Sequence, residues 1–173
     1  MNTSEIKTYI KDVPDFPKAG VIFKDITPLL ASPKVFEAVV EMLADSLKGK
    51  GITKVLGMES RGFIFAAPVA LRLNAGFVPV RKKGKLPRKT VAAEYALEYG
   101  TDILEMHADA IKPGEKVAIV DDVLATGGTC AAVADLVKRA GGELKTAAFL
   151  ISLDFLNGRA KLPAIEVKSL LQY

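Results

Sequence analysis

The 173-residue sequence contains one cysteine and one histidine. A single cysteine excludes an intramolecular disulfide and is consistent with a reducing cytoplasm. The histidine, His107, has no partner arrangement around it in the sequence. This removes a histidine-dependent catalytic triad and a zinc site from consideration.

Long apolar runs are also missing. No run reaches the roughly 20 residues that span a bilayer, and the opening MNTSEIKTYI lacks the apolar core of a signal peptide. We therefore expect a cytoplasmic protein with no membrane partner. The length suits one domain over residues 1–173. The net charge of +4 is modest and partly concentrated in residues 81–89, which favours an anionic small molecule over nucleic acid.

Two common phosphate-binding motifs are absent. The sequence contains no G-x-x-x-x-G-K-[ST] loop and no G-x-G-x-x-G. Instead, residues 117–130 read VAIVDDVLATGGTC, an apolar run followed by two acidic residues and a Gly-Thr loop. Apolar residues then recur with helical spacing over 133–140. Strand, glycine turn and helix together predict a phosphate cradle, because a helix N-terminus offers unpaired N–H groups and a positive dipole end.

A second strand–loop–helix segment precedes it. KVLGM at 54–58 predicts a buried strand, and the turn at 59–62 leads into an apolar helix. A third apolar strand at 77–80 is followed by the basic run RKKGKLPRK. Two such units that share one crevice are typical of a doubly wound sheet. Arg61 in the turn can bind phosphate oxygens through a bidentate fork.

The apolar strand, acidic pair and T-G-G-T loop resemble the phosphoribosyl-diphosphate (PRPP) signature of the type I phosphoribosyltransferases. The resemblance implies an α/β fold: a mostly parallel twisted sheet with helices on both faces, an N-terminal hood at about 12–30 and a flexible β-hairpin loop at about 88–107. It also implies a set of ligand contacts. Asp121 and Asp122 would bind the ribose hydroxyls; Ala125, Thr126, Gly127, Gly128 and Thr129 the 5-phosphate; and Glu59, Ser60, Arg61, Arg81, Lys82 and Lys85 the pyrophosphate.

Residues 12–30 contain three prolines and one glycine, which we expect to prevent a regular helix. The segment resembles the hood of adenine phosphoribosyltransferases. On that resemblance Phe23 stacks on the purine, and backbone groups of Ile22 and Lys24 bind its edge. Stacking on an aromatic ring contributes on the order of 1–3 kcal/mol, which adds affinity without selecting among purines.

The hairpin predicted over 91–99 and 101–107 contains LEYG at 97–100, which also matches the adenine enzymes. Glu98 is then the catalytic acid/base that manages the purine proton, acting with Arg61. The 6-oxopurine relatives have a lysine after the strand predicted at 145–153, to recognise the oxo group. Here the next lysine is Lys161. Its late position favours a 6-aminopurine.

The resemblance therefore implies purine salvage: adenine and PRPP give AMP and pyrophosphate, in a homodimer. It implies Mg²⁺ held by substrate oxygens, with no direct protein ligand. Two alternatives stay open at this stage. One is an enzyme for hypoxanthine, guanine or xanthine, and the other is a PRPP-sensing regulator that binds nucleic acid. A regulator needs a DNA-binding domain or a broad basic face, and the elements expected before residue 117 leave little chain for one.

Overall fold

The computed structural model describes residues 1–96 and 101–173 and divides into two compact units, residues 1–42 and 43–173. The first holds α1 (Thr3–Lys7), β1 (Lys11–Pro14), β2 (Ile22–Asp25), α2 (Thr27–Leu30) and most of α3 (Pro33–Leu47). β1 and β2 pair antiparallel, with Val13 opposite Phe23.

One expectation for this unit is wrong. The prolines and glycine do not exclude helix throughout residues 12–30, because α2 forms one turn at its end. Pro28 lies in the first turn of α2, where its missing N–H would be unpaired in any case. The side chain of Asp25 accepts the backbone N–H of Thr27 (2.9 Å) and its hydroxyl (2.9 Å), which helps to begin the turn.

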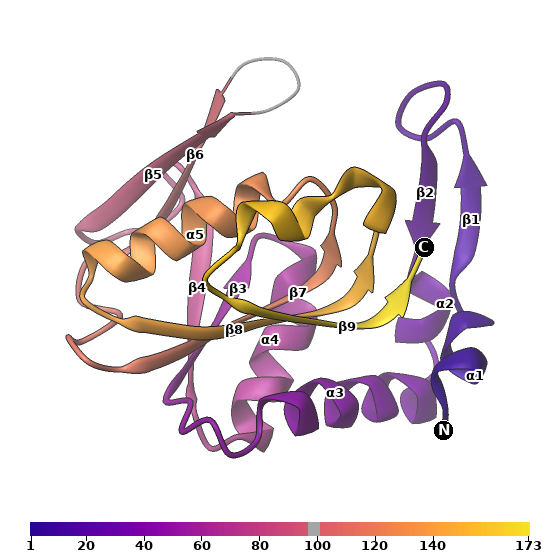
Figure 1. Cartoon of the computed structure of the whole chain (residues 1–173), viewed down its shortest axis with the longest axis horizontal. Coiled ribbons are helices and arrows are strands. Elements are labelled where there is room, and N and C mark those ends of the chain that lie inside the picture. The colour runs from indigo at the N-terminus through magenta and orange to yellow at the C-terminus, as the bar shows by residue number, and fades with distance from the viewer. Residues whose placement is uncertain (97–100) are drawn as a thin grey trace. The chain divides into compact units, whose positions relative to one another are not determined.

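In the described part of the second unit, seven strands form one sheet in the order β5-β6-β4-β3-β7-β8-β9 (Figure 1). Their bounds are β3 (Lys54–Met58), β4 (Gly76–Lys82), β5 (Thr90–Ala96), β6 (Thr101–His107), β7 (Lys116–Leu124), β8 (Glu143–Ser152) and β9 (Glu166–Gln172). β4, β3, β7, β8 and β9 run parallel, whereas β5 and β6 form an antiparallel hairpin at one edge. The mostly parallel sheet confirms the predicted fold class.

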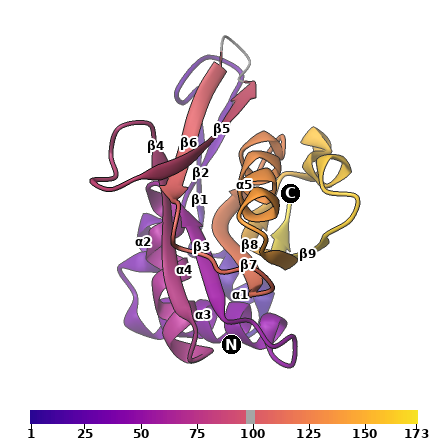
Figure 2. The same cartoon turned by 90° about the vertical axis from the view of Figure 1, so that its left-hand side faces the viewer.

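Two helices cover opposite faces of this sheet, α4 (Arg61–Arg72) and α5 (Gly128–Arg139) (Figure 2). The chain passes from β3 through α4 to β4 on one side, and from β7 through α5 to β8 on the other. The order therefore reverses between β3 and β7, and a ligand crevice forms at the carboxyl ends of strands at such a point. Short 3₁₀ turns follow β8, at η1 (Asp154–Leu156) and η2 (Gly158–Lys161).

β7 lies at the centre because it is apolar on both faces. Residues 117–120 are fully buried, as a strand covered by helices on both sides requires. The acidic pair still belongs to β7, which continues to Leu124, so these carboxylates are placed by the sheet ladder and not by a free loop. Among the residues described, none of the helices has the length and apolar character needed to cross a membrane.

Candidate active site

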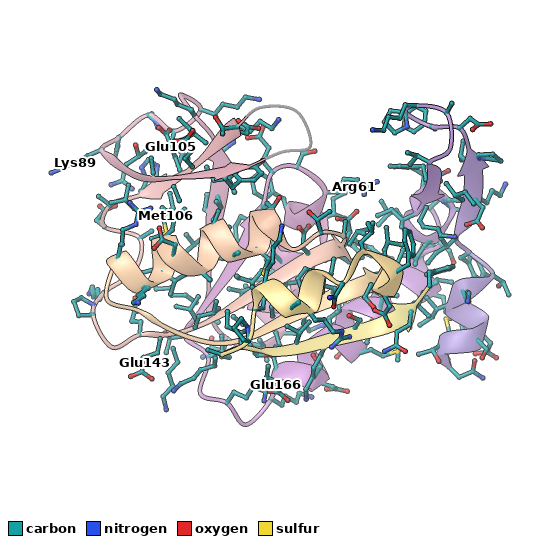
Figure 3. The ribbon with its side chains drawn as sticks, turned by 45° about the horizontal axis from the view of Figure 1, so that its top comes forward. Arg61, Lys89, Glu105, Met106, Glu143 and Glu166 are labelled. Atoms are coloured by element: carbon teal, nitrogen blue, oxygen red, sulfur yellow. The ribbon has the colours of Figure 1, made fainter. Side chains whose placement is uncertain are left out.

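A cavity of about 440 Å³ opens at the carboxyl ends of β3 and β7, where the strand order reverses. Figure 3 shows Arg61 at the start of α4, on this edge of the sheet. Ten of the residues predicted from the sequence line the cavity: Glu59, Ser60, Arg61, Lys82, Asp121, Asp122, Ala125, Thr126, Gly127 and Thr129. The two strand–loop–helix units therefore do converge on one site within the second unit.

The loop before α5 has the geometry of an anion cradle. Gly127 is the N-cap of α5 and has a φ of 77°, a left-handed conformation that glycine adopts without steric cost. No side chain caps the helix, so its first N–H groups are available to a ligand. Gly128 is the first residue of α5, next to the residues that line the cavity.

Gly158, which the sequence analysis did not single out, packs closely against this loop. A Cβ on Gly127 would lie 2.3 Å from the Gly158 carbonyl oxygen, and a Cβ on Gly158 would lie 2.2 Å from the Ala125 carbonyl oxygen. Both positions therefore exclude any side chain. The available signal was Asn157-Gly158, a pair typical of turns, but nothing local connects that turn with residues about 30 positions earlier.

The acidic pair and Arg61 line the cavity and contact one another. Asp121 Oδ1 accepts the backbone N–H of Asp122 (2.9 Å), and the Nε atom of Arg61 lies 2.6 Å from Asp122 Oδ2 in an ion pair. Desolvation, with the nearby charge of Asp122, raises the pKa of Asp121 well above its ordinary value. Gly62 permits this packing, because a Cβ there would lie 2.6 Å from Asp121 Oδ1.

Glu59, which also lines the cavity, binds three basic residues. Its carboxylate accepts hydrogen bonds from Lys85 Nζ (2.8 Å), the Lys82 backbone N–H (3.0 Å) and Arg81 Nε (3.3 Å). The bond from Lys85 is the main cause that lowers the pKa of Glu59 to about 2. Arg81 also donates to the Lys85 carbonyl oxygen (3.1 Å). Arg81 and Lys85 are thus connected to the site by their contacts with the Glu59 carboxylate. The peptide bond between Glu59 and Ser60 is cis.

Two residues that were not predicted are Tyr95, in the cavity wall, and Asp102, next to it. Tyr95 lines the cavity, and its hydroxyl donates to Asp102 Oδ2 (3.4 Å). The same oxygen lies 3.1 Å from Lys82 Nζ. The two residues face each other across the β5–β6 hairpin. Sequence reasoning had no signal for them, because their proximity depends on the hairpin register.

The remaining predicted residues belong to the first unit or lie outside the described residues. Ile22, Phe23 and Lys24 form β2 in the first unit, where Phe23 makes an edge-to-face contact with Phe16 (ring centroids 5.1 Å apart). Lys24 Nζ pairs there with Asp12 Oδ1 (2.6 Å). Glu98 lies outside the described residues. Within residues 1–96 and 101–173, no three His, Cys, Asp or Glu side chains gather as a metal cluster.

Comparison with known proteins identifies the family to which this cavity belongs. Residues 25–168 match the family described as the phosphoribosyl transferase domain. An adenine phosphoribosyltransferase from Erwinia tasmaniensis is 57% identical over 164 residues, which cover 95% of this chain and 90% of that protein.

Solved structures are similar over nearly the whole chain. The crystal structure of adenine phosphoribosyltransferase from Thermoanaerobacter pseudethanolicus has a TM-score of 0.97 at 52% identity, covering 99% of this chain and 100% of that one. The Saccharomyces cerevisiae enzyme, complexed with D-2,5-dideoxy-2,5-imino-altritol 1,6-bisphosphate and adenine, has a TM-score of 0.92 at 40% identity, covering 97% of each chain. The chain therefore belongs to the phosphoribosyltransferases, and within them to the adenine phosphoribosyltransferase family.

Proposed function

We propose that this chain transfers the 5-phosphoribosyl group from PRPP to N9 of adenine, giving AMP and pyrophosphate, and so serves purine salvage. One observation supports it most: an uncapped helix N-terminus, an acidic pair and an arginine line a single cavity. PRPP offers a matching series of groups, which are a 5-phosphate, two ribose hydroxyls and a pyrophosphate. The yeast relative, solved with adenine and a bisphosphate, supports the same pair of substrates.

The 5-phosphate end is the loop from Ala125 to Thr129. In our proposal its backbone N–H groups and the hydroxyls of Thr126 and Thr129 bind the phosphate oxygens. The loop contains no lysine, so this end relies on N–H groups and the helix dipole for its positive potential. Gly158 keeps the loop in place, because no side chain fits between it and residues 125–127.

The ribose lies over Asp121 and Asp122 in this proposal. The raised pKa of Asp121 favours its protonated form, which can both donate to and accept from a hydroxyl group. The Asp122 carboxylate forms an ion pair with the guanidinium of Arg61, which holds it in place beside the ribose hydroxyls. The two neighbouring carboxyl groups thus offer the hydroxyls both donors and acceptors.

The pyrophosphate end comprises Ser60, Arg61 and Lys82, with Arg81 and Lys85 behind them. Pyrophosphate leaves C1 with three or four negative charges, so positively charged groups must stabilise it as the bond breaks. Glu59 contributes indirectly, because its carboxylate holds Arg81 and Lys85 in place. The ribose becomes oxocarbenium-like while adenine N9 attacks the opposite face, which inverts the anomeric centre.

The purine contacts remain proposals from the sequence. Phe23 would stack on adenine, with the backbone groups of Ile22 and Lys24 at its edge. Glu98, outside the described residues, would handle the purine proton. A cytoplasmic homodimer is likewise a prediction from the family.

The donor set fits Mg²⁺ bound mainly through substrate oxygens. Carboxylate oxygens are ligands that Mg²⁺ accepts, and it commonly uses only one or two of them beside phosphate oxygens. Asp121 and Asp122 line the cavity, whereas the described residues contain no cluster of three metal-binding side chains. When bound, Mg²⁺ would neutralise charge on the pyrophosphate. The two acidic side chains would orient it through water molecules.

The test is product formation by the purified chain with adenine, PRPP and Mg²⁺, followed by chromatography. We expect AMP and pyrophosphate in equal amounts, and none when any one reactant is omitted. The matched variants are Asp122→Asn, in the cavity, and Asp135→Asn, whose carboxylate pairs with Arg139 on the exposed face of α5. Asp122→Asn should lower turnover and Asp135→Asn should not. Binding of PRPP without turnover of any purine would contradict the proposal and favour a regulator.

A further inference from the structure

Lys82 lies between the cavity and a carboxylate that stands outside it. Lys82 lines the cavity, whereas Asp102 does not. The ammonium Nζ is 3.1 Å from Asp102 Oδ2. A lysine ammonium has three N–H donors, so one can bind Asp102 while the others remain available to an anion in the cavity.

Asp102 is itself held firmly. Its Oδ1 accepts the backbone N–H of Ile103 (2.8 Å), and its Oδ2 accepts the hydroxyl of Tyr95 (3.4 Å). The bond from Ile103 and the contact with Lys82 keep the pKa of Asp102 below its usual value, so the carboxylate is charged at neutral pH. Tyr95 is directly opposite Asp102 in the hairpin. The carboxylate is therefore anchored to both strands of the hairpin.

Lys82 needs such an anchor. Its side chain is 56% exposed, and a lysine stem is flexible and loses much rotamer freedom when it binds a ligand. A group that already holds the ammonium at the cavity wall removes part of that loss before the ligand arrives. Arg81 and Lys85, by contrast, are already held by Glu59.

We propose that Asp102 is a positioning residue for the pyrophosphate end of the site, and that it acts by holding the Lys82 ammonium at the cavity wall. The proposal rests on the proposed function, since it requires pyrophosphate to bind beside Lys82. Asp102 touches neither substrate nor reacting atoms. Its effect should therefore reach pyrophosphate and PRPP only through Lys82.

Asp102 could instead weaken pyrophosphate binding. The direction of the change in Kd in the Asp102 variant therefore distinguishes the two effects. A carboxylate near Lys82 can compete with pyrophosphate for the ammonium, in which case its removal would tighten binding. The position of Asp102 outside the cavity favours positioning, because Lys82 can face pyrophosphate without leaving Asp102.

The experiment is calorimetric titration of magnesium pyrophosphate and, separately, AMP into the wild type, Asp102→Asn, Lys82→Gln and the double variant. We expect Asp102→Asn to weaken pyrophosphate binding about five- to tenfold, the scale expected when one flexible lysine loses its anchor. AMP lacks the pyrophosphate, so its Kd should not change. In the Lys82→Gln background, Asp102→Asn should add no further loss. With adenine as co-substrate, kcat/KM for PRPP should fall by a similar or larger factor, because Lys82 contacts pyrophosphate both when PRPP binds and as the bond breaks.

The matched control is Asp109→Asn. Asp109 also pairs with a basic residue, Arg88 (2.5 Å), which lies between β4 and β5. Neither Asp109 nor Arg88 lines the cavity. Its Kd for pyrophosphate should equal that of the wild type. Tighter binding, no change, or equal losses with and without Lys82 in the Asp102 variant would overturn the proposal. A wild type that makes AMP keeps the proposed function whatever these variants do, whereas a wild type that binds neither ligand would refute that function itself.

Discussion

The close contact between Gly62 and Asp121 predicts a variant that loses activity out of proportion to stability. A Cβ added at Gly62 would lie 2.6 Å from Asp121 Oδ1 and 3.2 Å from its Cγ, whereas ordinary contacts begin at 3.4 Å. In Gly62→Ala the carboxylate must therefore move by about 0.8 Å. The nearest atom belongs to the short side chain of Asp121, which is constrained and has few other positions to adopt.

The magnitude follows from what that movement breaks. Asp121 Oδ1 accepts the Asp122 backbone N–H at 2.9 Å, and losing such a bond in a desolvated place costs about 1–3 kcal/mol. Alanine favours the helix over glycine by about 1 kcal/mol, so the net loss should be about 0–2 kcal/mol. Turnover should fall far more, because a misplacement of about 1 Å in a catalytic site can cost about 10²-fold.

The assay pairs urea unfolding with the rate of AMP formation at saturating PRPP. Gly76→Ala is the control, because its Cβ would meet only the flexible end of the Lys54 side chain, at 3.2–3.3 Å, well away from the cavity residues. It should keep most of its activity. A Gly62→Ala variant with wild-type turnover would refute the reasoning, since it would mean that Asp121 can move freely without consequence.

Three further outcomes follow. Glu98→Gln should reduce kcat much more than it weakens PRPP binding, measured by steady-state kinetics and titration; an unchanged kcat would remove the assigned proton-transfer role. Glu59→Gln should unfold more easily at pH 7 by about 1 kcal/mol after allowance for solvent screening. Because the folded pKa of Glu59 is about 2, below its ordinary 4.5, that stabilisation is complete above pH 4.5 and is lost as pH falls toward 2, so the gap in urea midpoints should narrow over this range; a constant gap would contradict the assignment. Chelation of Mg²⁺ should abolish AMP formation, and added Mg²⁺ should restore it; turnover that persists in excess chelator would refute the metal requirement.

The central elements of the second unit were predictable because their signals are local. The apolar run at 117–120 and KVLGM at 54–58 are β7 and β3, and the glycines after β7 begin α5, as expected. Burial on both faces leaves such strands little compositional freedom. α2 was missed because a proline that stops a longer helix is compatible with the first turn of a short one.

Ten of the residues predicted from the sequence line the cavity, but the sequence did not show the contacts that connect them. The sequence indicated Glu59, Arg81 and Lys85 as one group, yet it could not show that the carboxylate binds both basic side chains. Asp102 and Tyr95 carried no motif, since their contact arises from the pairing register of β5 and β6. Gly158 supports residues about 30 positions away along the chain, which only tertiary structure reveals.

The most direct measurement of the central claim is a spectrophotometric assay that offers adenine, hypoxanthine and guanine in parallel, with PRPP and Mg²⁺. The account predicts AMP from adenine and no nucleotide from the two 6-oxopurines, at matched concentrations of enzyme and base. Efficient conversion of hypoxanthine or guanine would leave the PRPP site intact but contradict the assignment of adenine as the acceptor.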